Sequence, residues 1–158
     1  MRKILKFLKK IWILNFFRRT FSASKGLYKK SFQILKWGFK SREDTNFTYN
    51  LTKDNILYLA HTISVVTKTE IQQVLNYINE ANNDEELKNC IKKAVKESDF
   101  RKFADLEVRF GRRLGWYAFV RILKPKVVIE TGIDKGLGAI LLCSAFKKNK
   151  EEGFTGKY

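Results

Sequence analysis

The chain has 158 residues, which is enough for one ordinary domain with a hydrophobic core, and it contains 13 Phe, 6 Tyr and 3 Trp. Its net charge of +16 is concentrated in residues 1–40, which hold 12 Lys and Arg and no Asp or Glu; the remaining residues carry 20 basic against 16 acidic, a balance of +4. The best apolar run, residues 11–17, includes Asn15 and is far shorter than the roughly 20 residues that cross a bilayer.

Residues 2–21 have the periodicity of a two-faced helix, with Arg2, Lys3, Lys6, Lys9 and Lys10 on one side. Residues 22–40 repeat the basic and aromatic mixture more loosely, and Ser22, Ser24 and Gly26 predict a break between the two segments. We interpret residues 1–40 as a basic amphipathic leader that makes a peripheral contact with an anionic membrane surface. Packing on the rest of the chain or on a second subunit is an alternative. Nucleic-acid binding is disfavoured, because no recognised motif accompanies the charge.

Residues 41–123 are predicted to be helical after a polar link over residues 41–52. A helix over residues 53–66 would be capped by Thr52 or Asp54, and a second would open at Thr69-Glu70. Asn82-Asn83-Asp84 would end the second helix and cap a third. A longer helix is predicted from Phe103 to Leu123, and Pro125 marks the next boundary.

Residues 124–158 are predicted to begin an α/β domain. Lys126 to Glu130 form an unalternated apolar run, as expected of a buried parallel strand. A glycine-rich turn follows, then a helix over residues 137–148 and a loop over 151–156, and Lys157-Tyr158 would begin a second strand. The predicted organisation is therefore 1–40, 41–123 and 124–158. The fold class is α/β: a mostly helical N-terminal region followed by the first strand, glycine loop and helix of an incomplete Rossmann-like domain.

The segment Val127-Val128-Ile129-Glu130-Thr131-Gly132 resembles the first motif of class I S-adenosylmethionine-dependent methyltransferases. The stretches over residues 46–52 and 111–117 are also similar to segments that precede this strand in bacterial members. The resemblance implies S-adenosylmethionine as cofactor, with contacts from Glu130, Thr131, Gly132, Gly136 and Gly138. It further implies transfer of the cofactor methyl group to an acceptor, aided by positioning. Neither the acceptor nor a catalytic residue is identified by the sequence.

Two other interpretations of the turn stay open. Thr131-Gly132-x-x-x-Gly136-Leu137-Gly138 is similar to the dinucleotide turn of short-chain dehydrogenases, although that turn normally lies near the chain start and a carboxylate at Glu130 suits a pyrophosphate poorly. The other interpretation is that the glycine spacing is a coincidence and the turn binds no cofactor. Because the second-strand acidic residue and later strands are not present, we expect a truncated methyltransferase without turnover, or alternatively a small basic helical protein that binds a membrane or a partner without catalysis.

The remaining candidate residues point to structure rather than chemistry. His61 lies on a predicted helix with no Cys, Asp or Glu at metal-ligand spacing, and no metal site is predicted. Cys90 and Cys143 are interpreted as reduced core thiols of an intracellular protein. Because lysines interrupt the N-terminal apolar residues, a secretory signal is not expected, and we predict a cytoplasmic protein with a peripheral membrane contact and a possible homo-oligomeric state.

Overall fold

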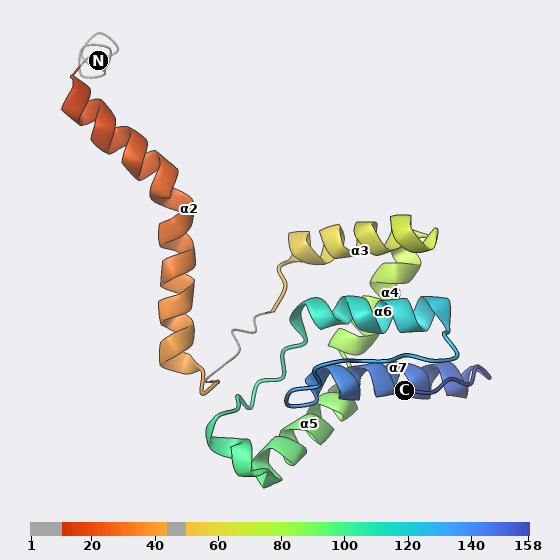
Figure 1. Cartoon of the computed structure of the whole chain (residues 1–158). Helices are drawn as coiled ribbons and strands as arrows, with labels where there is room; N and C mark the ends of the chain where they lie inside the picture. The colour runs from red at the N-terminus through yellow and green to blue at the C-terminus, as the bar shows by residue number, and fades with distance from the viewer. Residues whose placement is uncertain (1–10, 44–49) are drawn as a thin grey trace. The chain divides into compact units, whose positions relative to one another are not determined.

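The computed structural model describes residues 11–43 and 50–158 and divides the chain into two compact units, Met1–Glu43 and Asp44–Tyr158 (Figure 1). Residues 1–10 of the predicted leader and residues 44–49 of the predicted link lie outside the described residues. In the first unit, the described residues 11–43 form helix α2 (Trp12–Lys40). The second contains α3 (Lys53–Thr67), α4 (Ile71–Asn82), α5 (Glu85–Glu97), the 3-10 turns η1 (Asp99–Lys102) and η2 (Gly111–Arg113), α6 (Leu114–Leu123) and α7 (Leu137–Glu151).

Helix α2 is continuous over 29 residues, so the predicted break at Ser22, Ser24 and Gly26 is wrong. The Ser24 hydroxyl donates a hydrogen bond to the Thr20 carbonyl oxygen at 2.7 Å, within the preceding turn. A serine bonded in this way is accommodated inside a helix. The residue types that favour a break in isolation therefore stay within the helical ladder here.

Helix α6 is the central element of the second unit and packs against α3, α4 and α7 (Figure 1). Its own sequence is almost entirely apolar, which suits a helix that is covered on several sides. Most core side chains come from these four helices, and Ile91 of α5 and Phe110 before η2 complete the cluster. Those from the four helices are Ala60, Ile63, Val74, Ile78, Ala81, Leu114, Tyr117, Ala118, Val120, Leu141, Leu142 and Ala145.

Local capping signals place several helices where the sequence predicts them. Thr52 accepts a hydrogen bond from the Asn55 N–H at 3.2 Å and begins α3, and Asp84 accepts one from the Leu87 N–H at 2.8 Å and begins α5. Lys124 adopts a left-handed conformation with φ of 47° and ends α6 directly before Pro125. The predicted helix at residues 137–148 is also confirmed, and it continues to Glu151.

The predicted helix from Phe103 to Leu123 is wrong over its first half. Residues 103–110 are not helical, and Gly111 has a φ of 54°, which interrupts a right-handed helix. Asp105 and Arg109 have helical spacing, but they form their ion pair at 3.3 Å in irregular backbone. The regular helix begins only at Leu114, where the apolar residues become continuous.

The expected α/β class, with a Rossmann-like start, is also wrong, because the described residues contain helices and no β-strand. The segment 126–130 is extended, but it makes a single parallel bridge between Val127 and Lys157. The Val128 N–H donates to the Lys157 carbonyl at 2.9 Å, and the Lys157 N–H donates to the Lys126 carbonyl at 2.9 Å. These two bonds make one isolated bridge, and among the described residues no further bridge extends it into a ladder.

Candidate functional site

The glycine turn joins the extended segment 126–130 to α7. Gly132 and Gly136 have φ values of 75° and 80°, a region that side chains strongly disfavour, and Asp134 between them has a φ of 50°. The Gly136 N–H donates to the Ile133 carbonyl at 2.9 Å, which closes the turn directly before Leu137. No side chain in the described part of the chain caps the N-terminus of α7. Thr131 and Gly132 are exposed, so the turn presents its backbone to solvent.

Glu130 lies at the junction of this turn with α6 and α7. Its Oε2 accepts a hydrogen bond from the Tyr158 hydroxyl at 2.5 Å. Its carboxylate occupies the space that a Cβ at Gly138 would need, and such a Cβ would also lie 2.9 Å from the Trp116 ring. The hydrogen bond to Glu130 raises the pKa of Tyr158 to about 12. Partial desolvation, and then the Glu130 charge, raise the pKa of the Cys143 thiol.

We expect the substitution Gly138→Ala to break the contact between Glu130 and Tyr158. The new methyl group would overlap the Glu130 carboxylate, which must move because it is the far end of a flexible side chain. The pKa of Tyr158 should then fall from about 12 toward the ordinary value of about 10. Carbon-13 NMR titration of the tyrosine Cζ atoms measures this change, with Glu130→Gln as a reference for a weakened acceptor. An unchanged Tyr158 pKa in Gly138→Ala would contradict the proximity of Gly138 and Glu130.

The structure does not gather the other reactive side chains into a site. His61 is exposed on α3, and both cysteines are free. Cys90 and Cys143 are exposed, so their interpretation as core thiols is wrong. Among the described residues, no group of three or more His, Cys, Asp and Glu could hold a metal ion.

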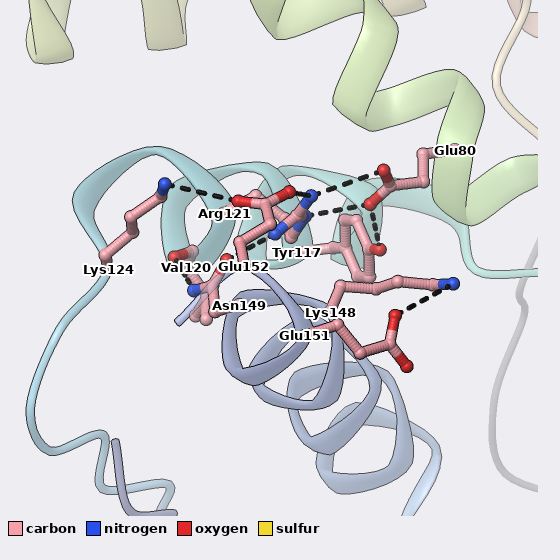
Figure 2. Close-up of polar contacts among 9 residues, drawn as sticks. All are labelled: Glu80, Tyr117, Val120, Arg121, Lys124, Lys148, Asn149, Glu151 and Glu152. Carbon is pink, nitrogen blue, oxygen red and sulfur yellow. Dashed lines mark hydrogen bonds and ion pairs between the residues drawn. The ribbon is translucent and has the colours of Figure 1, made fainter. Parts of the chain in front are cut away.

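A polar network centred on Arg121 joins α4, α6 and α7 (Figure 2). Arg121 is only 2% exposed. Its Nε donates to Glu80 Oε1 at 2.8 Å, its Nη1 to Asn149 Oδ1 at 2.5 Å and its Nη2 to Glu152 Oε1 at 2.5 Å. The Tyr117 hydroxyl also donates to Glu80, and the Tyr77 ring lies 4.8 Å from the guanidinium carbon.

The partners of Arg121 are themselves held in place. The Asn149 side-chain amide donates to the Val120 carbonyl at 2.8 Å, and Lys124 Nζ lies 3.2 Å from Glu152 Oε2. Burial alone would lower the pKa of Arg121, but its hydrogen bonds to Glu152 and Glu80 raise it instead. The guanidinium therefore remains charged, and we assign the network a structural role in fixing α4 and α7 onto α6.

Acid should weaken this network through Glu152. Hydrogen bonds from Arg121 and Lys124 hold the pKa of Glu152 below its ordinary value. A depressed carboxyl pKa in the folded state stabilises the fold above the unfolded pKa of about 4.3, and this contribution is lost as the pH falls through the folded pKa. Urea unfolding between pH 6 and about pH 3 should thus show a shallower loss of stability in Glu152→Gln than in the parent chain. If the free energy of unfolding falls equally with pH in Glu152→Gln and in the parent chain, protonation of Glu152 does not contribute to acid unfolding.

A pocket of about 690 Å³ lies in the second unit, and no residue of the glycine turn lines it. Asn50 and Leu51 line one side and Gly111 and Leu114 another, so the ends of two sequence stretches that resemble methyltransferase segments converge there. Lys88 and Lys92 on α5 add cations to its wall. Glu107 forms an ion pair with Arg109 and accepts a weak hydrogen bond from the Asn50 side chain at 3.4 Å. The hydrogen bond joins two segments that line the pocket, the one before α3 and the one before η2.

Helix α2 exposes apolar and basic side chains in separate arcs. At 100° per residue, all seven of its Lys and Arg residues fall within an arc of about 140°, and its Phe, Tyr, Leu and Ile residues fall within about 160° on the other side. It contains no acidic residue and no buried residue. Trp12 and Trp37 point in the same directions as Lys30 and Arg19, at the end of the basic arc. Phe17, Phe21, Phe32 and Phe39 are between 63% and 90% exposed.

None of the described helices combines the length and apolar character needed to cross a bilayer. Comparison with known proteins finds no matching family model, no similar curated protein and no similar solved structure. The resemblance to methyltransferases therefore rests on the sequence motif at residues 127–132 and on the two stretches at residues 46–52 and 111–117.

Proposed function

We propose that the chain binds the surface of anionic membranes through α2. The observation that carries this proposal is the separation of seven cations from an exposed apolar arc on one uninterrupted helix. At 1.5 Å per residue the helix is about 43 Å long, which exceeds the roughly 30 Å hydrocarbon core, and its cations are distributed from Arg18 to Lys40. A helix of this kind lies in the plane of the interface.

Both arcs contribute to the binding that we propose. The apolar arc inserts its aromatic and aliphatic side chains at the acyl boundary, and the two tryptophans at the end of the basic arc suit the level of the headgroups. Each Lys or Arg near an anionic surface contributes about 1 kcal/mol of attraction. Because the first 43 residues contain only one acidic residue, Glu43, this attraction is barely offset within the unit.

Vesicle sedimentation tests the proposal. The full chain should sediment with vesicles of phosphatidylcholine and phosphatidylserine, and much less with phosphatidylcholine alone. Binding should weaken as the salt concentration rises from about 0.1 M to 0.5 M, because salt screens the charge attraction. Tryptophan emission should shift to shorter wavelength on binding. Absence of sedimentation with the anionic vesicles, or equal sedimentation with both, would overturn the proposal.

A second candidate function is binding of S-adenosylmethionine at the glycine turn, as part of a methyl transfer reaction. This candidate is supported by the position of the Glu130 carboxylate beside the uncapped start of α7 and next to Gly138 and Trp116. The cofactor is cationic at its sulfur and amino groups, which suits a carboxylate. The exposed backbone from Thr131 to Gly136 leaves room for a ligand to approach.

Isothermal titration with S-adenosylhomocysteine, and with NAD(H) as the control ligand, tests this second candidate. Binding of the homocysteine compound that is lost in Glu130→Ala would support it. Binding of NAD(H) alone would favour a dinucleotide turn, and binding of neither ligand to a chain that circular dichroism shows to be folded would reject the candidate.

A further inference from the structure

One edge of the extended segment 126–130 has no partner in the described part of the chain. The bridge to Lys157 uses the Lys126 carbonyl and the Val128 N–H, which are backbone groups of even-numbered residues. In an extended segment the groups of odd-numbered residues point to the opposite edge. The N–H and C=O groups of Val127 and Ile129 therefore face an edge where no hydrogen bond is formed within residues 11–43 and 50–158.

The side chains beside this edge are apolar and uncovered. Val127 is 61% exposed and Ile129 is 84% exposed, and both project from the same face of the extended segment. Exposed β-branched residues along an open edge are the features that allow another polypeptide strand to pair. A second extended strand carries N–H and C=O groups at the same spacing, so it can form hydrogen bonds with the groups along this edge.

The sequence of the segment is complementary to itself in the antiparallel direction. If two copies pair with Val128 opposite Val128, Lys126 of each copy faces Glu130 of the other, and Val127 faces Ile129. In this register the odd-numbered residues form the hydrogen-bonded pairs, and they are the residues whose backbone groups are unpaired. Opposite charges and β-branched residues are favourable cross-strand neighbours.

We propose that two copies of the chain associate by antiparallel pairing of residues 126–130 along the Val127 and Ile129 edge. The pairing forms four backbone hydrogen bonds, two in each of the two Val127–Ile129 pairs. It also places Lys126 of each copy opposite Glu130 of the other, whose carboxylate accepts from the Tyr158 hydroxyl of its own chain as well. Pro125 limits the ladder, because it has no N–H to donate at the next position along this edge. The interface is small, so the dimer is weak and reversible.

The test is the oligomeric state of the full chain, measured by sedimentation velocity at about 10–500 µM, the range in which a small interface is populated. The parent chain should show a concentration-dependent dimer. Lys126→Glu and Glu130→Lys should each weaken the dimer by about tenfold or more, because each places like charges opposite each other. The double variant Lys126→Glu with Glu130→Lys should restore dimerisation, since the charge pairs are then reversed but complementary.

Two matched controls separate this interface from other surfaces. Lys150→Glu makes the same charge change on exposed α7 and should leave the dimer unchanged. Ile129→Thr should weaken the dimer, whereas Ile133→Thr, at a position that is 50% exposed and outside the pairing segment, should not. A parent chain that stays monomeric overturns the proposal, as does a dimer that resists both single charge changes or a double variant that fails to recover. Vesicle binding through α2 is measured separately and does not depend on this result.

Discussion

Replacing Arg121 with methionine is expected to lower the free energy of unfolding by about 3–5 kcal/mol, the range for removing one partner of a buried ion pair. Arg121 is 2% exposed and donates to Glu80, Asn149 and Glu152. Methionine replaces much of its aliphatic volume but none of its donors. The buried Asn149 would then lose the donor to its side-chain oxygen, and Glu80, whose side chain is 33% exposed, would lose its cationic partner. The cost follows from that loss rather than from a cavity.

Urea unfolding followed by circular dichroism measures this effect. Lys148→Met is the matched control, because Lys148 forms an exposed pair with Glu151 at 3.7 Å in the same region (Figure 2). Exposed pairs contribute about 0–1 kcal/mol, so this control should unfold almost as the parent chain does. If Arg121→Met and Lys148→Met lose the same stability, the network centred on Arg121 does not hold the three helices together.

Reversing the charge at Arg18, Lys25 and Lys29 is expected to weaken binding to anionic vesicles by about a hundredfold or more. All three residues lie within the basic arc of α2. Each substitution by glutamate removes an attraction of about 1 kcal/mol and adds a repulsion of the same kind. Glutamate is a good helix former, so α2 should remain helical. Co-sedimentation with vesicles that contain phosphatidylserine measures the change.

A triple variant with Lys93, Lys96 and Lys102 changed to glutamate provides the control. These lysines are exposed in the second unit, and the variant makes the same change in net charge. Vesicle binding close to that of the parent chain is expected for it. Equal losses in both triple variants would show that net charge alone, and not the arrangement on α2, controls the interaction.

The helix starts could be predicted from sequence because their determinants are local. The side chains of Thr52 and Asp84 each accept a hydrogen bond from the backbone N–H three residues later. The spacing of the apolar residues that follow predicts which face of each helix is buried. Val74, Ile78 and Ala81 lie on the buried face of α4, as helical periodicity indicates. Signals of this kind depend on residues within one or two turns.

The predictions of a helix from residue 103 and of a β-strand at residues 126–130 were wrong because each local sequence pattern is compatible with more than one backbone conformation. The charges Asp105 and Arg109 suit a helix, but the same ion pair forms in an irregular segment before Gly111. The Val-Val-Ile run suits a buried parallel strand, but a strand also needs partners, and the segment finds only Lys157. The assignment of a β-strand depends on a second segment, so one apolar run cannot establish it.

By itself the sequence determined the positions of α3, α4, α5 and α7, the glycine turn before α7 and the concentration of positive charge before residue 41. These features follow from neighbouring residues and from composition. Only the tertiary structure decided that Arg121 is buried, because its partners Glu80, Asn149 and Glu152 lie 41, 28 and 31 residues away along the chain. An arginine on a helix has the same local pattern whether it faces solvent or three distant acceptors, and the packing of α4 and α7 on α6 selects the second arrangement.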